Sequence, residues 1–437
     1  MIAADVDKLS YEIFSLLESK FLFGAGGDCL SGSGTPATEL VSGGRVRVLS
    51  IDGCGAAAED ALLAAAALAR LEAGLRKQAG DPDARVADFF DVSAGAGAGG
   101  VLAAMLFLRG AHGRPRYSAE EALAFVTENV GRKDWAGGRH GRWAKLFRGA
   151  RTGDQSLRRV SGDATLRDTV APLLVPCYDL ATAAPFMFSR ADAVESDTFD
   201  FRLRDVCVAT CAAHGAPVRS VDGLTAIAAA SAGMGNPTAA AITHVLHNKQ
   251  EFPLATGVED LLVLSIGGGA STSPATFSGR SSTPMFTCLS PRELARVTAE
   301  GVADMVDESV AMAFGHACGS NYVRIQASKS PTPVHAGTAA GAMLAQRNVE
   351  SVLFCGRRLS ERTNAEKVDA LATELVKEQE RRRCSPLPNI AIKQVGTAVA
   401  TAVVRDHRVV GDHGEDHVND AVAVIVPFAS VEELARP

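Results

Sequence analysis

The stretch DVSAGAGAGG, residues 91–100, places a dense run of glycines between an expected buried strand, ARVADFFDV, and an expected helix, GGVLAAMLFLRG. Such a turn lets another group approach the backbone closely. It can hold a phosphate at the N-terminus of the helix, or it can present a nucleophile at the end of a sheet. The residue types therefore leave two kinds of chemistry open, dinucleotide binding and covalent acyl transfer.

The dinucleotide interpretation depends on GAGAGG, residues 95–100, which matches the pattern G-x-G-x-x-G. In that fingerprint the glycines let the pyrophosphate approach the helix, and an acidic residue follows about twenty residues later, at the end of the next strand. The acids found there, Glu120 and Glu121, fall in an expected helix. Dinucleotide binding is therefore the weaker interpretation, and saturable NAD binding would be its test.

The acyl-transfer interpretation depends on a nucleophile elbow, G-x-S-x-G, in which small neighbours let the chain bend around a serine. The small neighbours are present, but the serine position falls on Gly97. Ser93 lies four residues earlier on an expected strand, about 13 Å away at about 3.3 Å per residue. A nucleophile must lie within about 3–3.5 Å of its target. Ser93 is therefore expected to be an ordinary residue at the end of a strand.

The elements that position this turn alternate between strands and helices. RVRVLSI (45–51) is an expected strand, DGCG (52–55) a turn and residues 56–78 a long helix, and a second strand, turn and helix follow at 89–108. Two such units in succession predict parallel strands joined by right-handed crossovers. Further strands are expected in LLVPCYDL, PFMFSR and DLLVLSIGGG, further helices at 205–214, 236–248, 299–314 and 363–383, a helix at 5–21, and a surface loop at 271–291.

Four motifs carry a resemblance to a known family: VLSIDGCG, ARVADFFDVSAGAGAGGVLAAML, GNPTAAAITHVLHNKQEFP and VEDLLVLSIGGG. In this order and spacing they resemble the plant patatin-like proteins, lipid acyl hydrolases, and most closely their third group, over residues 5–383. The resemblance implies an α/β chain with a three-layer α/β/α fold around a central, mostly parallel sheet. It also implies lipid degradation of the phospholipase A type, on acyl esters of phospholipids or galactolipids, by a Ser/Asp dyad without cofactor or metal.

The same resemblance divides the chain into an N-terminal helix and flexible linker (1–44), a patatin-like domain (45–383) and a C-terminal extension (384–437). It places the family's oxyanion loop on Gly53, Cys54 and Gly55, whose backbone N–H groups could face a developing oxyanion. The alternative for this loop is a tight turn that caps the following helix.

The two catalytic positions of the family fall on residues without reactive side chains. The nucleophile position is Gly97 and the base position is Ala229, counted back from the Asn-Pro pair at 236–237. Proteins of the third group have this glycine and are nonetheless described as lipid acyl hydrolases. Because losing a dyad member costs several orders of magnitude in rate, two functions stay open. The chain is a lipid acyl hydrolase, or it is a catalytically impaired pseudoenzyme that binds lipid or has a regulatory role at membrane surfaces.

Other polar residues near these motifs are weaker candidates for a catalytic or metal-binding role. Asp222, seven residues before Ala229, could substitute as the base, although Asp222-Gly223 is more typical of a hairpin turn. His244 and His247 lie three residues apart, where a surface or capping role is expected. Cys207, Cys211 and His214 share a helical spacing but have no fourth ligand nearby, so core packing is expected and no metal.

A basic segment with both tryptophans of the chain, GRKDWAGGRHGRWAKLFRGAR (131–151), contains seven basic residues and one acidic residue within a chain of net charge −6. Basic residues with interfacial aromatics favour anionic membrane surfaces; the alternative is a solvated loop with its aromatics packed inward. The candidates for membrane contact are Arg132, Lys133, Trp135, Arg139, Arg142, Trp143 and Lys145.

Composition limits the remaining classes. The negative net charge and 5% aromatic content argue against nucleic-acid binding. No apolar run is long enough to span a bilayer, and the first residues lack the pattern of a secretory signal. Nine cysteines without CxxC pairs favour free thiols in a reducing compartment. A cytoplasmic protein in peripheral contact with membrane lipids is expected.

Overall fold

The computed structural model describes residues 44–53, 58–129, 153–212, 215–231, 234–268, 291–328, 336–352, 355–385 and 390–392. The chain divides into two units, Met1–Val395 and Gly396–Pro437, and the second lies outside the described residues. The expected helix at 5–21, the loop at 271–291 up to residue 290, and the basic segment 131–151 also lie outside them.

The described residues form one large sheet whose strand order is β5-β6-β3-β2-β1-β7-β8, with β4 paired to β3. The strands β3, β2, β1, β7 and β8 are parallel, whereas β4 and β6 run antiparallel to β3, and β5 runs antiparallel to β6. Their bounds are β1 (Val46–Ile51), β2 (Val92–Gly95), β3 (Leu173–Asp179), β4 (Ala184–Ser189), β5 (Ala216–Arg219), β6 (Ala226–Ala230), β7 (Leu261–Ile266) and β8 (Tyr322–Ile325).

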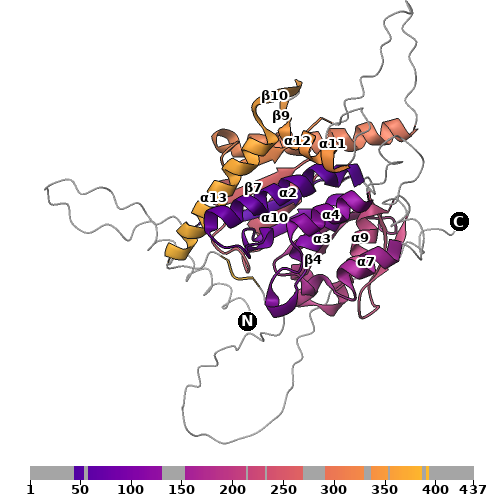
Figure 1. Cartoon of the computed structure of the whole chain (residues 1–437). Helices are drawn as coiled ribbons and strands as arrows, with labels where there is room; N and C mark the ends of the chain where they lie inside the picture. The colour runs from indigo at the N-terminus through magenta and orange to yellow at the C-terminus, as the bar shows by residue number, and fades with distance from the viewer. Residues whose placement is uncertain are drawn as a thin grey trace, which may run out of the picture. The chain divides into compact units, whose positions relative to one another are not determined.

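Helices cover both faces of this sheet (Figure 1). Alternate residues of β1 point to opposite faces: Val46 and Val48 pack in one core cluster, and Leu49 and Ile51 in the other. The first cluster contains α10 (Thr238–His247) and α11 (Pro291–Phe314). The second contains α2 (Ala58–Ala79), α3 (Gly97–Phe107), α4 (Ala119–Asn129), α7 (Gly153–Ser161), α9 (Leu203–Cys211), α12 (Ala336–Ala345) and α13 (Asn364–Cys384). The expected three-layer fold with a mostly parallel sheet is confirmed.

The helix α3 lies at the centre of its layer. Every residue from Gly97 to Phe107 is buried, which suits a helix that is apolar on all sides. In Figure 1, α2 lies alongside both α13 and the pair α3 and α4, and contacts between these helices agree with the view. The short helix α8 (Arg190–Glu195) follows β4, and a separate hairpin of β9 (Arg347–Val352) and β10 (Gly356–Thr363) precedes α13.

Two expectations about local structure were wrong. The expected strand ARVADFFDV contains a short 3₁₀ helix, η1 (Val86–Asp88), and β2 begins only at Val92. The Asp88 carboxylate accepts the Arg85 N–H at 2.8 Å, so local capping outweighs strand propensity here. The helix expected at 299–314 begins earlier, at Pro291, a residue that suits the first turn of a helix.

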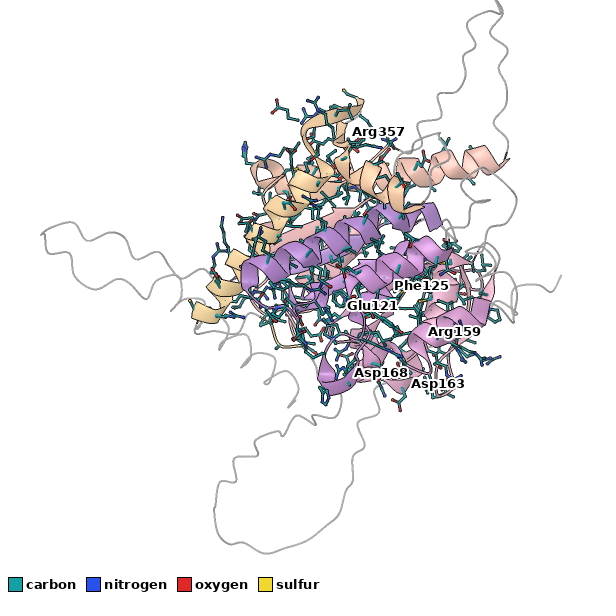
Figure 2. All side chains as sticks on the ribbon, viewed as in Figure 1. Glu121, Phe125, Arg159, Asp163, Asp168 and Arg357 are labelled. Carbon is teal, nitrogen blue, oxygen red and sulfur yellow. The ribbon has the colours of Figure 1, made fainter. Side chains whose placement is uncertain are left out.

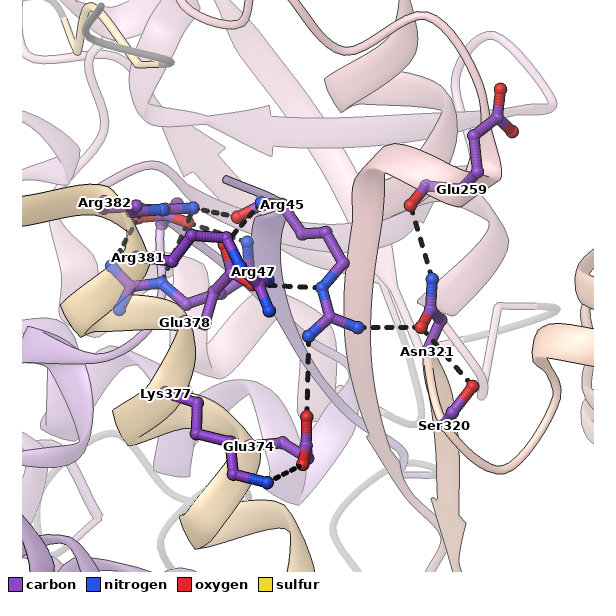
Figure 3. A network of polar contacts seen from close by, with 11 residues as sticks. Arg45, Arg47, Glu259, Ser320, Asn321, Glu374, Lys377, Glu378, Arg381 and Arg382 are labelled. Carbon is purple, nitrogen blue, oxygen red and sulfur yellow. Dashed lines mark hydrogen bonds and ion pairs between the residues drawn. The ribbon is translucent and has the colours of Figure 1, made fainter. Parts of the chain in front are cut away.

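Ion pairs tie α13 to the N-terminal end of the sheet (Figure 3). Asp91, just before β2, accepts hydrogen bonds from Arg47 Nη2 at 3.0 Å and from Arg382 Nη2 at 2.6 Å. Glu378 accepts the Arg45 N–H at 2.6 Å and Arg45 Nε at 3.1 Å. These five residues, the α13 network, join the first strand, the segment before the second and the last described helix.

Candidate active site

The turn between β2 and α3 has the backbone shape that a nucleophile elbow needs. Gly97 has φ of +52°, in the left-handed region that favours glycine. Its N–H donates to Thr210 Oγ1 at 2.9 Å, and the Thr210 hydroxyl donates to the Pro176 carbonyl at 2.9 Å. Thr210 therefore fixes the turn to α9 and β3, and its proton is directed at a carbonyl oxygen, not at a base.

The loop after β1 packs directly against this turn because both contain glycine. A Cβ on Gly99 would lie 2.5 Å from the Asp52 carbonyl oxygen, and a Cβ on Gly53 would overlap the Ala96 carbonyl oxygen. The Ala96 N–H also donates to the Ile51 carbonyl at 3.1 Å. The close approach of these two backbones is the central geometric feature of the site.

The predicted oxyanion loop is described only in part. The Gly53 N–H donates to the Gly235 carbonyl at 3.0 Å, and Cys54 and Gly55 lie outside the described residues. An oxyanion bound at the Gly53 amide would therefore have to replace the Gly235 carbonyl. The assignment of these three amides as oxyanion donors stays a prediction.

The predicted base position lies inside the sheet. Ala229 on β6 is fully buried and pairs with Asp179 of β3. Asp179 is a buried acid that the motifs did not single out. Its carboxylate accepts the N–H groups of Ala181 and Ala228, each at 3.1 Å, and the Thr182 hydroxyl at 2.7 Å. These hydrogen bonds assign Asp179 to the turn after β3.

The structure places Asp222 in the exposed turn between β5 and β6. Its Oδ1 accepts the Ser220 hydroxyl at 2.5 Å and the Leu224 N–H at 3.0 Å. These hydrogen bonds, the one from Ser220 first, lower the pKa of Asp222, which makes its carboxylate a weaker proton acceptor. Asp222 precedes β6, whereas Ala229 lies near the end of that strand.

A buried polar cluster lies beside the loop after β1, and the motifs did not predict it. Thr238 Oγ1 donates to Ser50 Oγ at 2.9 Å and lies 2.8 Å from Ser265 Oγ. Arg324 on β8 donates to Ser265 Oγ at 2.6 Å and to Asp52 Oδ2 at 2.5 Å. No sequence signal could have joined Arg324 to Asp52, because only the pairing of β1, β7 and β8 brings them together.

The charge of Arg324 is maintained by its neighbours. Burial lowers the pKa of the Arg324 guanidinium, but the carboxylates of Asp52 and Asp307 outweigh that effect, and the net shift is upward. A charged arginine therefore holds the Asp52 side chain in place. Arg324 acts as a positioning residue for the loop that approaches the Gly97 turn.

The remaining candidates do not meet at the turn. Ser93 is fully buried within β2. His244 is half-buried with its pKa lowered by burial, and its ring packs edge-on against Phe252. His247 is exposed.

Two of the three residues at the Cys207, Cys211 and His214 spacing lie in the core. Cys207 and Cys211 are buried, and burial raises the pKa of Cys207 to about 12. His214 lies outside the described residues, and the described part of the chain holds no cluster of metal-ligating side chains.

A mostly parallel sheet between helix layers, here with a left-handed glycine turn packed against a second glycine loop, is consistent with the patatin fold. The family model for patatin-like phospholipase matches residues 49–242, which include β1, the Gly97 turn and Ala229. The chain belongs to the patatin-like family of plants, which at the family level comprises lipid acyl hydrolases that act on membrane lipids.

Three curated relatives illustrate the relationship. Patatin-like protein 3 of Oryza sativa subsp. indica is 53% identical over 403 residues, covering 86% of this chain and 92% of the relative. Patatin-like protein 7 of Arabidopsis thaliana is 45% identical, covering 89% and 85%. "Probable inactive patatin-like protein 9" of Arabidopsis thaliana is 39% identical, covering 85% and 93%.

Among the described residues, no helix is both long enough and apolar enough to cross a membrane.

Proposed function

We propose that the protein is a lipid acyl hydrolase that cleaves acyl esters of phospholipids and galactolipids at the turn between β2 and α3. The observation that supports this proposal is the left-handed Gly97 backbone between a buried strand and a buried helix, packed against the Asp52–Gly53 loop. Acyl hydrolases place the reacting carbonyl between such a turn and the amides of a second loop.

Residue 97 has no side chain, so the proposed reaction does not pass through an acyl-enzyme at this residue. Water attacks the ester carbonyl directly, and the oxyanion is stabilised by backbone amides and by the positive end of α3. The bond between the acyl carbon and the lipid oxygen then breaks, and the proton released by water passes through solvent to that oxygen. The products are a fatty acid and a lysolipid.

This mechanism predicts slow turnover. An acyl hydrolase that lacks its catalytic side chains keeps a rate on the order of 10³–10⁴ above the uncatalysed reaction, from oxyanion stabilisation and binding alone. The proposed rate is therefore far below that of an enzyme with an intact dyad.

A second candidate is a lipid-binding protein without turnover. Glycine at position 97 and a fully buried alanine at position 229 favour it, as does the relative whose name describes it as inactive. For both candidate functions, the hydrolase and the lipid-binding protein, we propose that the basic segment 131–151 contacts the membrane, because its charge and tryptophans suit an anionic interface.

The test is fatty acid release by the purified protein from vesicles of phosphatidylcholine and of monogalactosyldiacylglycerol. A Gly97→Ala variant adds a methyl group at a backbone angle that side chains rarely adopt and should reduce release. Release that is unchanged in this variant points to a contaminating lipase, and vesicle binding without release supports the second candidate. Loss of vesicle binding on neutralising Arg142 and Lys145 would support the assigned membrane contact.

A further inference from the structure

A second site lies away from the Gly97 turn. A cavity of about 480 Å³ lies against the edge strand β8, between α11, the β9–β10 hairpin and α13. Its lining does not include Gly53, Gly97 or Ala229. The volume lies within the range of about 300–1,000 Å³ that is typical of small-molecule sites. We call this space the β8 cavity.

Basic side chains line one side of the β8 cavity. Arg358 and Arg362 come from β10, and Lys367 comes from the first turns of α13. Glu350 of β9 pairs with Arg358 at 3.1 Å and with Lys367 at 2.9 Å. Burial raises the pKa of Glu350, but the hydrogen bond and charge of Lys367 outweigh it, and the net shift is downward. One carboxylate therefore lies between two cations, and a positive charge is left over.

The other acids of the lining already have partners. Asp307 accepts the Tyr322 hydroxyl at 2.6 Å and lies 4.0 Å from Arg324. Glu374 pairs with Lys377 at 2.9 Å and with Arg45 at 3.7 Å. Among the acids of this lining, only Glu350 therefore pairs with the basic side chains of β10 and α13.

Arg362 is an exposed cation of the lining. Within the described part of the chain it forms no ion pair, and its attraction is to Glu366. Both the N–H and the hydroxyl of Thr363 already donate to that carboxylate, in the cap of α13. The Arg362 guanidinium therefore keeps donors for a ligand.

We propose that the β8 cavity binds a small phosphorylated compound, with the phosphate held by Arg358, Arg362 and Lys367. Three cations from two elements suit a dianion with several acceptor oxygens. The organic part of the ligand lies on the apolar side of the lining, which includes Ala311, Val323 and Leu371.

A ligand in the β8 cavity also affects the loop beside the Gly97 turn, because both contact the side chain of Arg324. Arg324 lines the cavity and also holds Asp52 at 2.5 Å. A ligand that attracts or repels Arg324 changes the support of the Asp52–Gly53 loop. The buried Arg324 side chain therefore contacts both the β8 cavity and the Asp52–Gly53 loop.

The test is calorimetric titration of the full chain with glycerol 3-phosphate. Arg362→Gln should weaken binding about tenfold, because it removes a charge-assisted hydrogen bond, and a variant with Arg358→Gln added should weaken it further. The matched control is Arg357→Gln, which Figure 2 marks on the same hairpin. Arg357 pairs with Asp304 at 2.5 Å and does not line the cavity, so its replacement should leave binding unchanged.

Flotation on phosphatidylcholine vesicles with and without phosphatidic acid separates two sources of the phosphate. Extra binding that needs phosphatidic acid and is lost with Arg362→Gln assigns the site to a lipid head group. Titration with glycerol 3-phosphate but no such flotation assigns it to a soluble compound. The proposal is overturned if neither probe binds the native chain, or if Arg357→Gln weakens binding as much as Arg362→Gln does.

Discussion

The two ends of the strand β2 carry different kinds of residue. After its C-terminal end, the position that the family resemblance assigns to the nucleophile holds Gly97, and the assigned base position, Ala229 on β6, also has no polar side chain. Before its N-terminal end, Asp91 is buried and pairs with Arg47 and Arg382. The residue at the turn after β2 therefore has no side chain for catalysis, whereas a buried ion pair holds the segment before β2.

The fold therefore does not depend on the side chains that would perform catalysis. The α13 network and the buried core hold the sheet together, whereas the Gly97 turn is held by backbone and by Thr210. Stability and activity should therefore respond to different substitutions.

The largest effect is expected on activity, from restoring both dyad positions. The double variant Gly97→Ser, Ala229→Asp should raise fatty acid release by on the order of 10³-fold, because nucleophile and base act as a unit. Neither single variant should show this increase. Thermal unfolding of each variant serves as the control for the new carboxylate in a buried position. Full activity of Gly97→Ser alone would show that another group is the base.

The next effect is on stability. Asp91→Ala leaves the buried Arg47 and the partly buried Arg382 without their carboxylate and should cost about 3–5 kcal/mol of unfolding free energy, measured by urea titration. The matched control is Asp369→Ala, whose pair with Arg70 is half exposed and should cost about 0–1 kcal/mol. Equal losses in the two variants would contradict the structural role assigned to the buried pair.

A pH dependence follows from the same carboxyl group. Burial raises the pKa of Asp91, but Arg47 and Arg382 outweigh it and the net shift is downward. Since the folded pKa lies below the unfolded value, the stabilisation is present above about pH 4 and is lost as the pH falls through the folded pKa. Unfolding free energy measured against pH should fall less steeply in acid for Asp91→Asn than for the native chain. Parallel curves would contradict the assignment.

The smallest effect is expected at Asp222. Asp222→Asn keeps an oxygen that can accept from Leu224 and Ser220, so fatty acid release and the unfolding midpoint should stay near their native values. The comparison is with Asp179→Asn, which changes a buried carboxylate with three donors and should lower the midpoint. A selective loss of release in Asp222→Asn would identify Asp222 as the base after all.

Sequence patterns predicted the elements whose signals are local. The first strand, the helices α2 and α13 and the glycine turn follow from apolar periodicity and from small residues. The late start of β2 was missed because the Asp88 cap competes with strand propensity over a few residues. The hairpin β9–β10 was missed as well, since β10 is charged and mostly exposed and β9, RNVESV, does not alternate regularly between apolar and polar residues.

For the candidate site, the sequence predicted only the positions that lie within the motifs. The proximity of Gly53 to the Gly97 turn follows from two neighbouring parallel strands that end at the same edge. The link from Asp52 to Arg324, across 272 residues of sequence, depends on tertiary pairing that no local pattern records. The same holds for the β8 cavity, whose walls come from α11, β8, the hairpin and α13.

In this account residue 97, the family's nucleophile position, has no side chain and no acyl-enzyme forms at it. Intact-protein mass spectrometry after treatment with a fluorophosphonate ester tests it most directly. The native chain should show no adduct, and the Gly97→Ser, Ala229→Asp variant should show one adduct at residue 97. A stoichiometric adduct on a serine, threonine or cysteine of the native chain would contradict the account.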